Sequence, residues 1–136
     1  MGHNNGYGYG DTFRGCSSLK KVTASDKLEK IGHSAFLNCL NLEDITSLNG
    51  CISLYTSAFE SCKKLKQSSI DNCSFILIKN DNNSIFKNCE ALTSVTLAQG
   101  TTFIGGATFY KCSGLTTVTI PSSVTSIGNE AFLQCS

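Results

Sequence analysis

Apolar side chains recur along this chain with a period of about 23 residues. A phenylalanine is followed three residues later by a cysteine six times, at Phe13/Cys16, Phe36/Cys39, Phe59/Cys62, Phe86/Cys89, Phe109/Cys112 and Phe132/Cys135. The steps between successive pairs are 23, 23, 27, 23 and 23 residues. Leucine, and then valine or isoleucine, keep the same phase after most of these cysteines. A period in the twenties predicts a solenoid, in which each repeat is one coil that buries its apolar face against its neighbours.

The most regular coil, residues 112–135, indicates how each coil is built. Val118–Ile120 is a short, β-branched stretch and predicts a strand. After a proline, Val124 and Ile127 are expected to point inward again. Residues 129–135 predict a short helical turn or a bend that returns the chain to the next coil. Each coil is therefore expected to hold a strand, a second short extended piece and a compact return.

One coil, near residues 62–88, departs from this plan. Ser68 stands where other coils carry Val or Ile, and four residues are added before the next phenylalanine. Within it, Phe75–Ile78 predicts a strand and Lys79–Asn83 a polar turn. Insertions in solenoids usually map to loops, so we expect this one to bulge from the side of the coil.

The length of 136 residues suits one domain. We predict a solenoid over residues 12–136, made mainly of short parallel β-strands with short helical or irregular returns. Residues 1–11 are predicted to be an irregular N-terminal segment, in part a candidate cloning remnant. The last repeat is expected to be truncated, since the sequence stops in mid-coil.

Six of the eight cysteines keep the phase of the repeat, one per coil, and no Cys-x-x-Cys pair occurs. Zinc ligands converge on one point, whereas these cysteines form a line. The favoured interpretation is that each fills a small apolar space in the core. Disulfide bridges between coils are the alternative, because stacked strands lie about 4.8 Å apart. Cys51 and Cys73 fall outside the pattern.

The charge balance argues against two classes of partner. Eleven basic and ten acidic residues give a net charge of +1, which provides no electrostatic attraction for nucleic acid or an anionic membrane. No run approaches the roughly 18 apolar residues needed to cross a bilayer, so membrane insertion is not expected. The first residues also lack the pattern of a secretory signal.

The motif itself resembles a known family. Residues 115–135 read Leu-x-x-Val-x-Ile-Pro-x-Ser-Val-x-x-Ile-Gly-x-x-Ala-Phe-x-x-Cys, and residues 28–45 match over LEKIGHSAFLNCLNLEDI. This pattern is similar to the BspA-like leucine-rich repeats of surface and adhesin-type proteins. Only Pro121 keeps the proline, and the alanine is replaced at Thr12, Ile85 and Thr108. The resemblance implies a right-handed leucine-rich-repeat superhelix with a concave parallel sheet used for binding or adhesion. It also favours the cell surface or the extracellular space.

Outward positions of the predicted strands form columns that suggest a ligand face. Alternation in a strand places residues between inward positions on the outer face of the sheet. The predicted face consists of Lys21, Thr23, Asp44, Thr46, Gln67, Ser69, Ser94, Thr96, Thr117 and Thr119. Its N-terminal half is charged and its C-terminal half is rich in hydroxyls. The alternative is that Thr and Ser simply suit an exposed strand and the charges aid register.

We therefore predict a non-enzymatic protein-binding or cell-adhesion module without a cofactor, whose partner is a protein such as a host or extracellular-matrix protein. The alternative is a structural segment of a longer array, with its ligand site elsewhere and self-association through uncapped ends. Catalysis has little support, because the sequence shows no organised nucleophile–base pair. Of the two histidines, His3 lies in the irregular start and His33 is expected to be an exposed turn residue.

Overall fold

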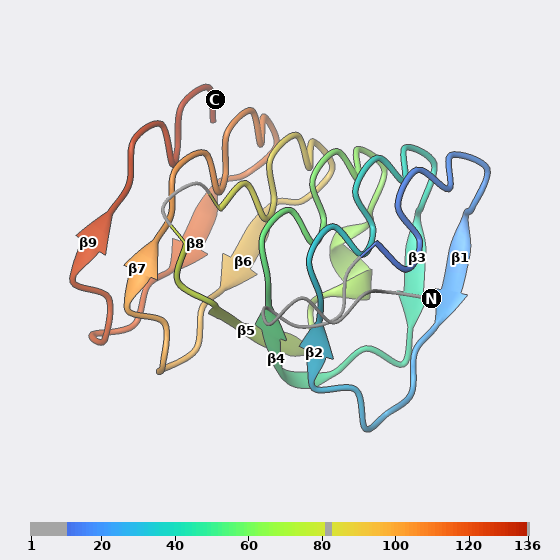
Figure 1. Ribbon diagram of the computed structural model, residues 1–136, viewed down its shortest axis with the longest axis horizontal. Coiled ribbons are helices and arrows are strands. Elements are labelled where there is room, and N and C mark those ends of the chain that lie inside the picture. The colour runs from blue at the N-terminus through green and yellow to red at the C-terminus, as the bar shows by residue number, and fades with distance from the viewer. Residues whose placement is uncertain (1–10, 81–82, 136) are drawn as a thin grey trace.

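The chain winds into a parallel β-solenoid, as the repeat predicts. The computed structural model describes residues 11–80 and 83–135, so most of the predicted N-terminal segment, and His3 within it, lies outside the described residues. Each regular coil supplies a first strand, a second strand on the other side of the coil, and a return that carries the Phe-x-x-Cys motif (Figure 1). The fold is that of a leucine-rich-repeat solenoid.

The two rows of strands are short and parallel (Figure 1). The first strands are β1 (Lys21–Thr23), β3 (Asp44–Thr46), β6 (Ser94–Thr96) and β8 (Thr117–Thr119). The second strands are β2 (Lys30–Ile31), β4 (Gly50–Leu54), β5 (Cys73–Leu77), β7 (Phe103–Ile104) and β9 (Ser126–Ile127). Hydrogen-bonded ladders join β1 to β3, β6 to β8, β2 to β4 to β5, and β7 to β9.

Inward positions in the first strands form the core in register. Val22 pairs with Ile45 and Val95 with Val118. The strand expected at Val118–Ile120 is observed one residue earlier, at Thr117–Thr119. Ile127 corrects a second expectation: it is 51% exposed, because no described coil stacks beyond β9.

The phenylalanines of the six returns form one continuous stack. Neighbouring rings lie nearly parallel, with centroids 5.2–5.7 Å apart and interplanar angles of 5–16°. The backbone follows the same step, since the amide of Phe59 donates to the Ile85 carbonyl at 2.9 Å and that of Phe86 to the Thr108 carbonyl at 2.9 Å. Stacked rings add roughly 0.5–1.5 kcal/mol per pair beyond burial alone. The returns therefore hold the coils in register.

The return is a bend and not a helical turn, which settles the two alternatives left by the sequence. In every return the residue two before Phe and the residue before Cys have a left-handed backbone; Ser57 (φ 60°) and Ser61 (φ 65°) are examples. Left-handed residues end a right-handed helix. The chain instead forms successive tight turns, such as the one closed by the Cys62 amide on the Phe59 carbonyl at 3.0 Å.

The eight cysteines are free, and those of the inner returns are core residues, as the favoured interpretation predicts. Cys39, Cys62, Cys89 and Cys112 are buried, whereas Cys16 and Cys51 are exposed. In the five returns from Cys39 onward, each cysteine thiol donates to a carbonyl of the preceding coil, at 2.9–3.2 Å. The acceptors are the carbonyls of Phe13, Phe36, Phe59, Phe86 and Phe109. The cysteines of this column therefore connect neighbouring coils through hydrogen bonds that their thiols donate.

The third coil lacks a first strand, contrary to the prediction. Residues Gln67–Ser69 form a 3-10 turn, η1, which lies between β3 and β6 (Figure 1). Ser68 is exposed, while Ser69 and Ile70 are buried. A serine at the inward position has no apolar group to bury, so the chain turns and buries Ile70 instead.

Two side chains replace some of the backbone hydrogen bonds that this missing strand would make. The Ser69 hydroxyl accepts from the Ile45 amide at 3.1 Å. The Gln67 side-chain oxygen accepts from the amides of Thr93 and Ser94 at 2.8 and 3.0 Å, and its nitrogen donates to the Ser94 carbonyl at 3.0 Å. The side-chain amide of Gln67 therefore makes the hydrogen bonds that a backbone peptide group would make, and it connects β6 to the third coil.

The four added residues follow β5, which begins two residues and ends one residue before the predicted strand. Both Asn83 and Ser84 donate their amides to the Gly106 carbonyl, at 3.1 and 3.2 Å. A Cβ atom on Gly105 would stand 2.4 Å from the Asn80 carbonyl oxygen, so this contact requires glycine. Because residues 81–82 lie outside the described residues, the sideways bulge stays a prediction.

The buried thiols make stability depend on pH. Burial raises the pKa of Cys89 well above its usual range and that of Cys112 to about 12. An unfolded thiol ionises near pH 8.5, so these thiols stabilise the fold fully below that pH, and the contribution is lost as pH rises through the folded pKa. We expect the urea midpoint, measured with reductant, to fall from pH 7.5 to pH 10. Compared with the unmodified chain, the fall in the urea midpoint should be smaller in Cys89→Ala and the same in Cys51→Ala. An equal fall in the unmodified chain and both variants would contradict this expectation.

Gln67 should contribute to stability in proportion to the backbone groups it satisfies. We expect Gln67→Ala to lower the free energy of unfolding by about 1–3 kcal/mol, because amides of β6 lose their acceptor. Ser68→Ala, next to it and exposed, should change it by less than about 0.5 kcal/mol. Urea denaturation of both variants is the measurement. Equal, small effects would show that water replaces the Gln67 amide without cost.

Candidate functional site: the first-strand face

The ten residues of the predicted ligand face are distributed unevenly. Lys21, Thr23, Thr96, Thr117 and Thr119 are exposed on β1, β6 and β8. Three more, Asp44, Thr46 and Ser94, are half-buried. These eight residues form what we call the first-strand face. It has two parts, β1–β3 and β6–β8, separated by η1.

The remaining two predicted residues do not belong to an exposed column. Ser69 is 8% exposed and its hydroxyl serves the Ile45 amide. Gln67 is half-buried and its side chain is committed to Thr93, Ser94 and Asp71. The reason for both corrections is the 3-10 turn, which rotates these positions out of the strand pattern. The sequence signal was the pair of serines at 68 and 69, where other coils have an apolar residue before a hydroxyl.

Hydroxyl groups of adjacent coils lie next to one another on both parts of the face. Thr46 donates its hydroxyl to that of Thr23 at 3.2 Å. In the second part, Ser94 pairs in register with Thr117, and Thr96 with Thr119. Each row can offer hydrogen-bond donors and acceptors at the spacing of a β-sheet. The face is thus suited to polar contacts over several coils.

Charge is confined to the N-terminal part of the face. Lys66 lies 3.8 Å from both the Glu43 and Asp44 carboxylates, so opposite charges pair between the second and third coils. All three side chains are at least a third exposed, so these pairs contribute little to stability.

A polar groove opens beside η1, in the middle of the face. It has a volume of about 280 Å³ and lies between β3 and the third coil. Its lining includes Asp44, Thr46, Ser47, Asn49, Ser68 and Asn72. The sequence does not predict this groove, because it exists only where the third coil leaves the strand row.

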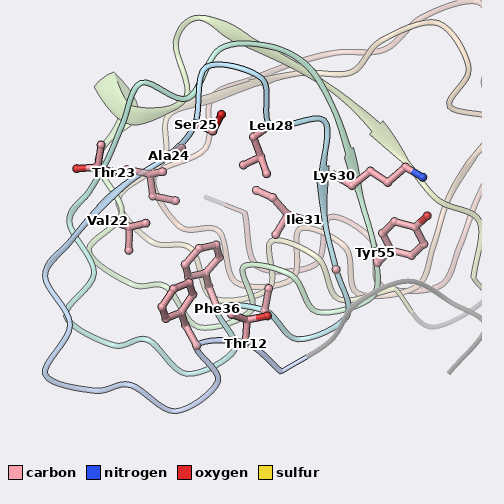
Figure 2. Close-up of a pocket in the computed structure, with 14 residues that line it drawn as sticks. Thr12, Val22, Thr23, Ala24, Ser25, Leu28, Lys30, Ile31, Phe36 and Tyr55 are labelled. Atoms are coloured by element: carbon pink, nitrogen blue, oxygen red, sulfur yellow. The ribbon is translucent and has the colours of Figure 1, made fainter. Parts of the chain in front are cut away.

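A second hollow, of about 370 Å³, opens at the N-terminal end of the solenoid (Figure 2). Its lining is largely apolar and includes Val22, Leu28, Ile31 and Phe36. These are core positions of the first coil, and the space above them is where a preceding coil stacks in a repeat array. The hollow is therefore a property of the coil end and lies apart from the polar groove.

Other chemistry is sparse in the described part of the chain. His33 is half-buried and its ring lies 5.4 Å from that of Tyr55, so it is not the exposed turn residue that the sequence suggested. No three His, Cys, Asp or Glu side chains of residues 11–80 and 83–135 converge as metal ligands. None of the helices found within these ranges has the length and apolarity to span a bilayer.

Solved structures share this architecture. A leucine-rich cell surface protein from Faecalibacterium prausnitzii A2-165 is 27% identical with a TM-score of 0.66, over 86% of this chain and 37% of that protein. A leucine-rich repeat protein from Bacteroides ovatus is 30% identical with a TM-score of 0.57, over 90% of this chain and 36% of that protein. A leucine-rich repeat protein from T. pallidum, at 22% identity and a TM-score of 0.60 over 88% of this chain and 61% of that protein, shares the fold. The chain thus spans less than two thirds of each.

No curated protein sequence matches the chain. The family model of the BspA type leucine-rich repeat region matches residues 9–136, in six copies. These six copies agree with the six Phe-x-x-Cys returns and with the ring stack that they form. The chain therefore belongs to the BspA-type leucine-rich-repeat family.

Proposed function

We propose that the chain is a non-enzymatic protein-binding or adhesion module and that the first-strand face is its ligand surface. The observation that carries this proposal is the in-register pairing of Ser94 with Thr117 and of Thr96 with Thr119. Three of these four side chains are exposed, and they offer hydroxyl groups on neighbouring strands. A partner that lies across the strands meets the same chemistry at each step.

The chemistry of the face favours a protein partner. Nucleic acid would require a basic stripe, whereas Lys21 is the one cation among the eight face residues. Solenoids commonly use such extended surfaces for protein recognition, and one structural neighbour is described as a cell surface protein. These points support a partner on a host cell or in the extracellular matrix and a location at the cell surface. Interface hot spots favour Trp, Tyr and Arg, and the face has none of them, so modest affinity is expected.

The competing proposal is a structural segment of a longer array that self-associates through its ends. It is favoured by the apolar hollow at the first coil and by the exposure of Ile120 (43%) and Ile127 (51%) at the last. Sedimentation over a range of concentrations detects such association. Association through the ends leaves the first-strand face free. The two proposals therefore differ in which surface a mutation must change to abolish the interaction.

The decisive test changes the face without changing the core. The triple variant Thr23→Glu, Thr96→Glu, Thr119→Glu places carboxylates on both parts of the face. The purified chain is screened against extracellular-matrix and host-cell-surface proteins, and each binder is measured again with the variant. We expect at least about a tenfold loss of affinity, roughly 1.4 kcal/mol.

A matched control carries Ser18→Glu, Thr102→Glu and Ser126→Glu, which add the same charge at exposed positions away from the face. It should bind as the unmodified chain does, and circular dichroism checks the fold of both variants. Binding that survives the face variant, or that both variants reduce equally, would favour the structural-segment alternative.

A further inference from the structure

The backbone ladder between the second and third coils is made at both ends and broken in the middle. At one end, the Lys66 amide donates to the Glu43 carbonyl at 2.9 Å. At the other, the Gly50 amide donates to the Asn72 carbonyl at 3.0 Å. Between these contacts η1 turns away from β3, and the polar groove occupies the space.

Two backbone groups of β3 and its end point into this break. The Thr46 carbonyl accepts from the Ala24 amide of the first coil at 2.8 Å, so the Ser47 amide, in the same peptide unit, points the opposite way. The Ile45 amide points toward the third coil, as its bond to the Ser69 hydroxyl shows. Alternation along a parallel strand gives the Ile45 carbonyl the same direction. Neither the Ile45 carbonyl nor the Ser47 amide has a hydrogen-bond partner among residues 11–80 and 83–135.

The other coils show what normally fills this position. In the pair β6–β8, the amide of Leu97, which is equivalent to Ser47, donates to the Thr119 carbonyl at 3.0 Å. In the pair β1–β3, the equivalent amide is that of Ala24, which bonds to Thr46. One residue of the following strand therefore completes this part of the ladder in both regular pairs. Among the described residues of the third coil, none does so.

The groove has room and chemistry for a strand segment supplied from outside. Ser47 and Asn49 are exposed at its margin, and Ser68 and Asn72 stand on the opposite wall. A carbonyl acceptor and an amide donor on the two residues that flank Thr46 match the pattern of parallel pairing, in which one partner residue bonds to both. An antiparallel strand instead uses the amide and carbonyl of a single residue.

We propose that this groove binds an extended segment of a protein partner, which adds to β3 as a short parallel strand with one residue opposite Thr46. This inference rests on the proposed protein-binding function and specifies the form of the bound segment. The partner residue donates its amide to the Ile45 carbonyl and accepts from the Ser47 amide. In strand addition of this kind, main-chain hydrogen bonds provide the affinity, and side chains next to the paired residue add specificity.

The test uses a probe that has the right backbone and needs no natural partner. A synthetic peptide with the sequence of residues 113–121 carries the β8 strand, which fills the equivalent position beside β6. It is titrated into the full 136-residue chain labelled with nitrogen-15. We expect the Ser47 amide to show a saturable shift, and its hydrogen exchange to slow by at least about tenfold. A peptide methylated on the nitrogen of the residue equivalent to Thr119 should bind at least about tenfold more weakly.

Two variants of the chain complete the experiment. Ser68→Trp should block the groove and abolish the shift at Ser47. Thr102→Trp, on an exposed position away from the face, should leave it unchanged. Shifts at Thr117–Thr119 in place of Ser47 would mean addition to the outer sheet edge and would overturn the proposal, as would equal binding of the methylated peptide. The triple variant Thr23→Glu, Thr96→Glu, Thr119→Glu changes no residue that lines the groove. A failure of the proposed face function can therefore be distinguished from a failure of peptide binding in the groove.

Discussion

Each coil is fixed to the next by a phenylalanine ring that stacks on the equivalent ring of its neighbour. The stack passes through all six returns with little variation in distance or angle. Around it, amides of the returns bond to carbonyls one coil further on, and thiols bond to carbonyls one coil back. Such a column sets the rise and register of the coils once per turn. The strands, only two to five residues long, follow this register and are too short to impose it.

This arrangement explains how the third coil can lose a strand without interrupting the solenoid. The rings of Phe59 and Phe86 remain stacked at 5.7 Å across it, although η1 has replaced the strand and four residues are added. The side chains of Gln67 and Ser69 then satisfy some of the ladder groups, including the amides of Thr93 and Ile45. What remains is a local break in the first-strand row. The first-strand row can hold this gap because the ring stack, and not the sheet, maintains the solenoid.

Most of the architecture could be predicted from the sequence, because the residues that determine it repeat. Phenylalanine and cysteine at fixed spacing predict the coil length and the core column directly, and they favour free thiols over disulfide bridges between coils. The groove could not be predicted, since it depends on which backbone groups lack a partner when one coil turns aside. Gln67 shows the difficulty: as a polar residue at an outward strand position it indicates a binding surface, yet its amide substitutes for a peptide group. Only the arrangement of the neighbouring strand reveals that role.

The returns, more than the strands, maintain the solenoid through the irregular coil. Native-state hydrogen exchange, read residue by residue, tests this directly. This dominance of the returns predicts that the amides of Phe36, Phe59 and Phe86, each bonded to the following coil, exchange most slowly and open together with the global unfolding. It would be contradicted if the amides of β1–β3 or β6–β8 were the better protected, or if protection in the returns fell sharply between Phe59 and Phe86.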